Sequence, residues 1–243
     1  MIGITKIRKL LLLLLLTLSI HTMNGQNNIT ANEPLNIQQQ SIVSISALTA
    51  VGDLEHLKAE LNTGLEAGLT VNEIKEVLVQ LYAYCGFPRS LNAINTFMNV
   101  VEERKAKGIT DKYGKEASPI TDTADKYERG RRTLETLTKT PQVKPAPGFG
   151  EFAPRIDAFL KEHLFADIFD NDILSYQQRE LATISMLSAM QGVAPQLQAH
   201  LKMGMNTGLT QTVLRQVFSL IEKHIGKQQA EVAESVLSKM IAN

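Results

Sequence analysis

The chain has 243 residues, which is enough for one large domain or two domains of ordinary size. The chain has 25 basic and 25 acidic residues. It therefore lacks the net positive charge that would favour a nucleic acid or an anionic membrane as a partner. The single cysteine, Cys85, excludes an intrachain disulfide and a Cys-x-x-Cys redox pair.

The N-terminal residues 1–25 have the pattern of a secretory signal peptide. A basic segment, Lys6–Lys9, precedes the apolar stretch Leu10–Ile20, and the small residue Gly25 follows. The apolar stretch is well short of the roughly 20 residues that span a bilayer. We therefore expect cleavage near Gly25, a periplasmic or secreted protein, and no stable membrane span after cleavage.

Residues 26–40 are polar and are predicted to be extended, and residues 41–105 are predicted to form a first helical unit. Apolar residues recur with helical spacing from Ala47 to Leu65, and Gly52–Asp53 marks a break between two helices. Gly68 is predicted to end the second of them.

A capping box, Thr70-x-x-Glu73, predicts the start of the next helix, and Gly86 its end. Pro88 suits the first turn of a further helix. The inward residues of that helix are predicted to be Leu91, Ile94, Phe97 and Val101.

Residues 106–152 are predicted to be a connector with one short helix, Tyr127–Leu137. Residues 153–243 are predicted to form a second helical unit. Its helices are expected at Pro154–Phe169, from the Ser175-x-x-Gln178 capping box to Met190, and at Pro195–Met205, Thr210–Ile225 and Gln229–Ile241.

The two units are copies of one pattern. The sequence Gly-x-x-x-Gly-Leu-Thr occurs at Gly64–Thr70 and again at Gly204–Thr210, and leucines upstream of both copies also match. Such self-similarity indicates one supersecondary unit used twice. Because no window alternates as a strand does, we expect an all-α fold.

Both units also contain segments with a recognisable pattern. In the first unit they are Ile74–Leu78, Tyr84–Pro88 and Leu91–Ala93, and in the second Phe165–Phe169, Gln178–Ile184, His200–Leu201 and Asn206–Thr210. These segments resemble the carboxymuconolactone decarboxylase family, within the alkylhydroperoxidase D-like superfamily. The resemblance implies an all-α helical bundle of two repeated units, a homo-oligomer, and a site made from an acid on one helix and a histidine on another.

Glu76 matches the acidic position of the family, which implies a general acid or base. On a helical wheel it shares a face with Val79 and Ala83, which favours a second buried interface. The alternative is a surface carboxylate that the helix dipole stabilises near the N-terminus.

His200 matches the family's histidine and could exchange protons near neutral pH, or it could be a histidine at the edge of the core. Arg179 matches a family arginine that could hold a substrate carboxylate, or it could be a solvated helix residue. Tyr84 and Cys85 match a further motif, and their alternatives are a packed ring and a buried thiol. Cys85 lies at the C-terminal end of one predicted helix, which disfavours a thiolate, and just before the start of the next, which favours one. Its reactivity is therefore undecided.

The two copies have kept different polar residues. Gln216 stands at the place of Glu76, Glu60 at that of His200, and Gln40 at that of Arg179. His224 and Ile225 replace Tyr84 and Cys85. Either the two sets combine in one composite site, or both copies have lost the chemistry.

The sequence predicts an exported enzyme of the carboxymuconolactone decarboxylase type that acts without cofactor on a small carboxylated lactone or related acid. The histidines show no metal-ligand spacing, so no metal site is expected. The alternatives are thiol-dependent peroxide reduction through Cys85, with an external thiol to restore it, and a non-catalytic helical assembly module.

Overall fold

The structure is a computed structural model that describes residues 34–242, and all of its regular elements are helices. The all-α prediction is confirmed, while the predicted signal peptide lies outside the described residues. The helices are α2 (Ile37–Val51), α3 (Leu54–Glu66), α4 (Val71–Cys85), α5 (Phe87–Ala106), α6 (Lys126–Thr138), α7 (Phe149–Phe152), α8 (Pro154–Ala158), the π-helix η1 (Phe159–Ile168), α9 (Tyr176–Ala189), α10 (Ala194–Asn206), α11 (Gln211–His224) and α12 (Lys227–Ala242).

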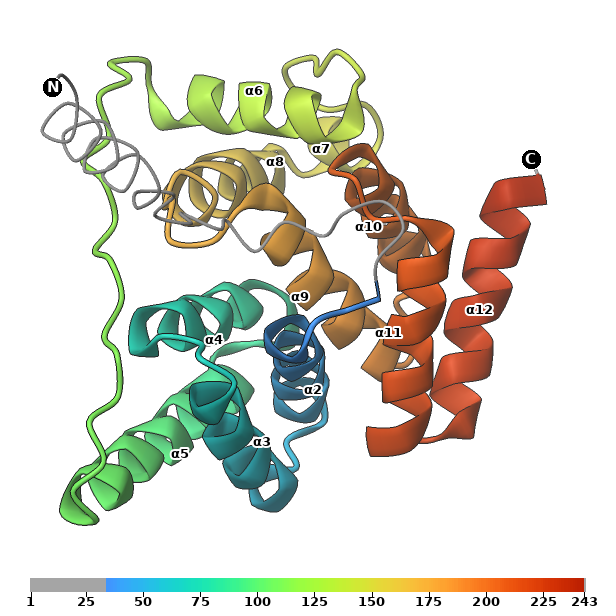
Figure 1. Ribbon diagram of the computed structural model, residues 1–243. Coiled ribbons are helices and arrows are strands. Elements are labelled where there is room, and N and C mark those ends of the chain that lie inside the picture. The colour runs from blue at the N-terminus through green and yellow to red at the C-terminus, as the bar shows by residue number, and fades with distance from the viewer. Residues whose placement is uncertain (1–33, 243) are drawn as a thin grey trace, which may run out of the picture.

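Helices α2 and α9, which hold equivalent places in the two copies, pack against each other at the centre of the molecule (Figure 1). Helix α2 also contacts α11 of the second unit, and α9 contacts α4 of the first. Nearly every residue of α9 is buried, because neighbouring helices cover it on all sides. The two units therefore share one apolar core, which runs through α2, α4, α9 and α11.

The predicted helix boundaries rest on capping interactions that the structure contains. Capping boxes are present at Thr70–Glu73 and at Ser175–Gln178. A third, at Asn36–Gln39, begins α2. The expectation that residues up to 40 are extended is therefore wrong for Ile37–Gln40, because the Asn36 side chain caps this turn.

The predicted inward face of α5 is wrong at Leu91, which is 52% exposed. Phe97 is buried as predicted, and Ile94 and Val101 are half-buried against the core. The residues of α5 that are fully covered are Ser90, Ala93, Phe97, Val100 and Arg104. Helix α5 thus carries two adjacent stripes, and its neighbours α3 and α4 cover one of them more completely. Periodicity locates such stripes but does not say which one the neighbouring helices cover.

The connector contains the predicted short helix, α6, which packs along η1 (Figure 1). A Cβ at Gly130 would lie 1.8 Å from the Lys161 carbonyl oxygen, so only glycine permits this approach. The Lys161 ammonium is fully buried and donates to Asp157 at 2.7 Å and to Tyr127 at 2.9 Å. These bonds satisfy the buried charges and fix α6 on η1.

Within residues 34–242, every helix is either too short or too polar to cross a bilayer.

Candidate functional site

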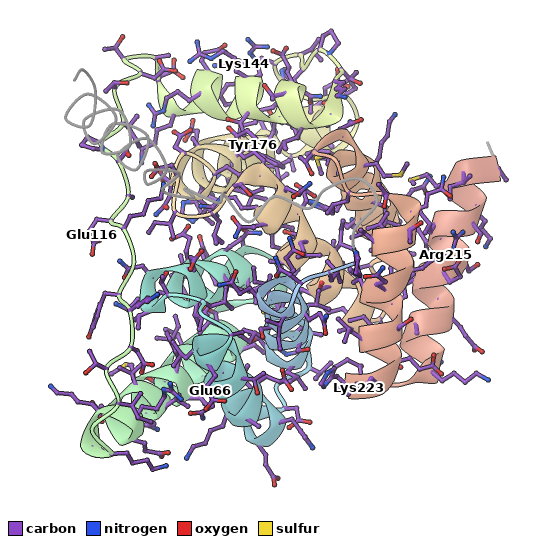
Figure 2. All side chains as sticks on the ribbon, in the orientation of Figure 1. Glu66, Glu116, Lys144, Tyr176, Arg215 and Lys223 are labelled. Carbon is purple, nitrogen blue, oxygen red and sulfur yellow. The ribbon has the colours of Figure 1, made fainter. Side chains whose placement is uncertain are left out.

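The candidate site lies where α4 of the first unit meets α9 and α10 of the second. Helix α4 directs Glu76, Gln80 and Tyr84 toward these helices, because the three residues follow one another at intervals of four along one helix face. Side chains from both units lie in the space between α4 and α9 (Figure 2). The predicted site residues of both units therefore meet at one interface.

Glu76 is only 7% exposed, so it is not a surface carboxylate. The residues expected to share its buried face, Val79 and Ala83, are exposed instead. The face that is buried with Glu76 contains Gln80, because α9 presents polar groups there rather than an apolar stripe.

Glu76 and Arg179 form a buried ion pair. Arg179 Nη2 donates to Glu76 Oε1 at 2.9 Å, and Asn171 Nδ2 donates to Glu76 Oε2 at 3.0 Å. The Arg179 side chain is fully buried, and its guanidinium lies over the Phe169 ring at 5.4 Å.

The guanidinium makes further bonds within the protein. Nη1 donates to Gln80 Oε1 at 2.8 Å, and Nη2 also donates to the Asn171 carbonyl at 2.6 Å. Gln80 in turn donates to the Arg179 carbonyl and to Thr183 Oγ1. Both terminal nitrogens of Arg179 are thus occupied, which leaves little freedom to clamp a substrate carboxylate.

Burial sets the direction of both pKa shifts. It raises the pKa of the Glu76 carboxyl, against the opposing attraction of Arg179. It also lowers the pKa of the Arg179 guanidinium, against the opposing attraction of Glu76. Each charge therefore depends on its partner, since neither is solvated.

His200 is held by a second buried acid, Glu180 of α9. The His200 Nδ1 and Glu180 Oε2 atoms are 2.8 Å apart. A carboxylate oxygen accepts, so Nδ1 carries a proton, and Nε2 is the ring nitrogen that is left to take up or release one. Nε2 has no hydrogen-bond partner among the described residues. This is the arrangement of an oriented general acid or base.

Gly204 of the repeated motif brings α10 close enough for this contact. A Cβ at position 204 would lie 2.7 Å from Ile184 Cδ1 and 3.7 Å from Glu180 Cβ. The missing side chain therefore lets α10 approach α9 at the turn beside Glu180. The motif that defines the repeat thus also positions His200.

Tyr84 comes from the other unit and packs edge-on against the His200 ring, with 5.4 Å between ring centroids. Burial, with a contribution from the Glu180 carboxylate, raises the pKa of the Tyr84 hydroxyl. The hydroxyl therefore stays protonated, and the ring fixes one face of the imidazole.

Cys85 is half-buried at the end of α4. Burial raises the pKa of its thiol more than the nearby Arg89 charge lowers it. The balance works against a thiolate at neutral pH.

The structure joins the two predicted sets, but through neighbours rather than directly. Glu76 contacts Arg179, and Tyr84 contacts His200. Among the described residues, the Glu76 carboxylate bonds only to Arg179 and Asn171. Sequence reasoning missed the roles of Glu180, Gln80 and Asn171. For Glu180 the sequence offers one indication: it is a charged residue within a helix whose other residues are mostly apolar or small.

Within residues 34–242, no group of His, Cys, Asp or Glu side chains is arranged to hold a metal ion.

Comparison with known proteins agrees with the repeat and with the fold. A family model described as "Carboxymuconolactone decarboxylase family" matches residues 21–97 and 154–237, more than half of the chain. The chain belongs to the carboxymuconolactone decarboxylase family. Membership supports a carboxymuconolactone decarboxylase-like or related function.

An uncharacterized protein of Methanocaldococcus jannaschii is also similar. It is 25% identical over 81 residues, which cover 33% of this chain and 76% of that protein.

Proposed function

We propose that the protein is a cofactor-free enzyme in which His200 moves a proton at a small carboxylated lactone or related acid. One observation supports this most: Glu180 holds the imidazole through Nδ1, and Nε2 is left without a partner among the described residues. A buried acid that fixes the tautomer of a histidine is a general way to prepare it for acid–base work.

The chemistry suits a decarboxylation. When the bond to the carboxyl carbon breaks, CO₂ leaves and the electron pair stays on the adjacent carbon, stabilised by the lactone carbonyl. The imidazolium form of His200 then donates its Nε2 proton to that carbon and becomes the neutral imidazole. A proton from solvent afterwards restores the imidazolium. Tyr84 restricts the ring, and Glu180 stabilises its positive charge.

In this proposal Glu76 and Arg179 are positioning residues. They hold Asn171 and Gln80 against the start of α9 and so fix the helix that carries Glu180. This differs from the expectation that Arg179 holds the substrate and that Glu76 transfers the proton, because both groups are already bonded to each other.

We also propose that the protein is exported and forms a homo-oligomer. Export is supported by the basic and apolar pattern before Gly25. Oligomerisation is supported by the exposed apolar residues of α5, among them Phe87, Leu91 and Met98.

The central test is His200→Ala, assayed on a substrate found by screening small carboxylated lactones and β-keto acids. We expect kcat to fall about 10²–10⁴-fold, with little change in the urea unfolding midpoint. Glu180→Gln should lower kcat less and shift its pH profile, since the ring remains but loses its charged partner. Full activity of His200→Ala would refute the proposed role of His200. No turnover of any screened substrate by the wild type would favour the assembly module.

The peroxide alternative has a separate test. Cys85→Ser should leave the decarboxylase activity within about twofold, because the thiol takes no part in the proposed step. If Cys85 were a peroxidatic thiol, the variant would lose peroxide turnover in the presence of an external thiol, and the wild type would show such turnover.

A further inference from the structure

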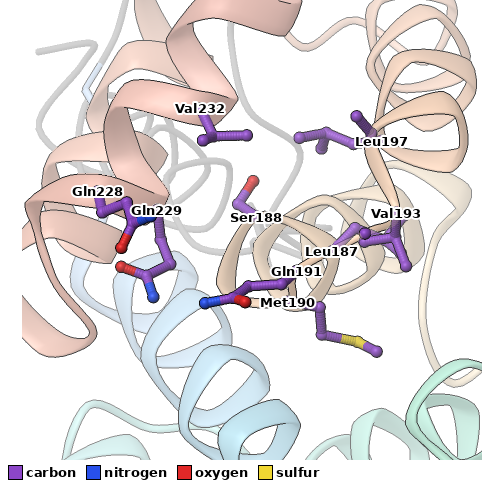
Figure 3. A pocket seen from close by; sticks show the side chains of 11 residues that line it. Leu187, Ser188, Met190, Gln191, Val193, Leu197, Gln228, Gln229 and Val232 are labelled. Carbon is purple, nitrogen blue, oxygen red and sulfur yellow. The ribbon is translucent and has the colours of Figure 1, made fainter.

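A pocket lies at the opposite end of α9 from Arg179, between α9, α10 and the start of α12 (Figure 3). Its volume is about 200 Å³. Apolar walls come from Leu187, Leu197 and Val232, and polar groups come from Ser188, Gln228 and Gln229. His200 and Glu180 are not part of its lining, so a molecule bound here would not contact the imidazole.

Ser188 gives the pocket an unpaired hydroxyl. The residue is only 3% exposed, and its Oγ atom has no hydrogen-bond partner among the described residues. Figure 3 shows this hydroxyl pointing into the space between Val232 and Leu197. Because an unpaired buried hydroxyl is costly, a ligand that bonds to it would recover that cost.

The start of α12 supplies a second polar feature. Gln228 and Gln229 lie in its first turn, and backbone N–H groups of a first helical turn have no acceptor within the helix. The N-terminus of a helix also carries partial positive charge. Both features favour an acceptor oxygen near this turn.

The first unit closes the equivalent position. Arg89 stands there in place of Gln229, and its guanidinium donates to the Ala50 carbonyl at the end of α2. Gln229 is shorter and uncharged, so the end of α9 stays open. The two copies thus differ in the side chain that lies at this end of the equivalent helices.

We propose that this pocket binds a small, neutral, single-ring molecule that carries a carbonyl group. A cavity of about 150 Å³ is enough for a benzene ring, so 200 Å³ admits a ring with one polar substituent. The ring would contact Leu197 and Val232, and the carbonyl oxygen would accept from Ser188. None of the described residues that line the pocket has a cationic side chain, so the partial positive charge at the start of α12 is not joined by the full charge that a buried anion needs.

The proposal can be tested with benzamide as the probe on the full mature chain. In ¹³C-methyl NMR spectra, benzamide should shift the Leu197 and Val232 signals saturably, with a dissociation constant on the order of 1 mM. Benzoate has the same shape with a negative charge, and we expect it to bind at least tenfold more weakly, about 1.4 kcal/mol.

Two variants address the site itself. Ser188→Ala should weaken benzamide binding about 2- to 10-fold, the value of one hydrogen bond. Ser185→Ala is its matched control, because Ser185 lies one turn earlier and donates to the Leu181 carbonyl outside the pocket. Gln229→Arg introduces the residue of the first unit and should abolish binding.

Circular dichroism establishes that each variant is folded. If Gln229→Arg does not fold, the comparison of Ser188→Ala with Ser185→Ala tests the site by itself. Absence of saturable shifts in the wild type overturns the proposal. So does unchanged binding by Ser188→Ala, and tighter binding of benzoate than of benzamide refutes the neutral ligand class. His200→Ala should bind benzamide normally, which separates this site from the proposed reaction.

Discussion

The α4–α9 interface and its counterpart between α11 and α2 are built from equivalent residues, but one is ionic and the other neutral. Glu76 and Arg179 pair directly in the first. In the second, Gln216 accepts from the Leu35 backbone N–H at 2.8 Å, and Gln40 donates to the Leu35 carbonyl at 2.7 Å. The same helix packing thus accommodates an ion pair on one side and a backbone segment on the other.

The histidine position differs in the same way. Gly64 packs against Ile45 and Ser41 as Gly204 packs against Ile184 and Glu180. Where the second unit has the His200–Glu180 pair, the first has Glu60 and Ser41, and Ser41 donates to the Ile37 carbonyl instead. The backbone arrangement is therefore repeated, while the oriented imidazole is not.

This difference shows why the ionisable groups occur as a set. A buried charge is tolerated only with a partner of opposite charge. In a copy that lacks one residue of the ion pair, a neutral residue is therefore favoured at the other position as well. The neutral copy keeps the stability of the fold at lower electrostatic cost.

The largest expected effect is on stability at the ion pair. Arg179→Met leaves Glu76 buried without its partner and should lower the free energy of unfolding by about 3–5 kcal/mol in urea. Gln40→Met is the matched change in the neutral copy and should cost about 0.5–1.5 kcal/mol, one hydrogen bond. Equal costs would mean that the two interfaces do not differ as described.

The double variant Glu76→Gln, Arg179→Gln sharpens this comparison, because it makes the α4–α9 interface neutral like its counterpart between α11 and α2. It should be more stable than Arg179→Gln alone. A double variant that is less stable than the single one would contradict the ion-pair argument.

The next effect concerns the repeated glycine. Gly204→Ala forces a Cβ within 2.7 Å of Ile184, and we expect a cost of about 1–3 kcal/mol with a lower kcat, because α10 must move away from Glu180. At Gly64 the closest atom would be 3.2 Å away, so Gly64→Ala should cost less and leave kcat unchanged. Thermal unfolding and steady-state assays of both variants check this, and equal loss of kcat would count against positioning by Gly204.

The smallest effect is a pH dependence in the neutral copy. Burial lowers the pKa of His224 below its ordinary value of 6.5, and its Nε2 lies 3.2 Å from Ser44 Oγ. The unfolded chain therefore binds the extra proton first, so stability is lost as pH falls from 6.5 through the folded pKa.

His224→Gln should reduce this loss between about pH 7.5 and pH 5.5, measured by urea unfolding at each pH. Tyr84→Phe, at the equivalent place, should keep the wild-type pH dependence because the Tyr84 hydroxyl does not titrate in this range. An unchanged slope in His224→Gln would rule out His224 as its source.

The sequence by itself determined the helices and the repeat. Local signals such as the Thr70 and Ser175 capping boxes and the glycines at 52 and 86 act within a few residues, so helix boundaries follow from the chain alone. The matching motifs also located the polar residues of both units, but left open whether they combine in one site or belong to two copies that have lost the chemistry.

Only the tertiary structure decided which groups contact each other. The pairing of Arg179 with Glu76, and of His200 with Glu180, depends on how closely α9 approaches α4 and α10. The same holds for α5, where the chain offers two apolar stripes and the neighbours cover one. Packing between distant segments selects among faces that periodicity leaves equivalent, and so it fixes the partner, the burial and the pKa of each group.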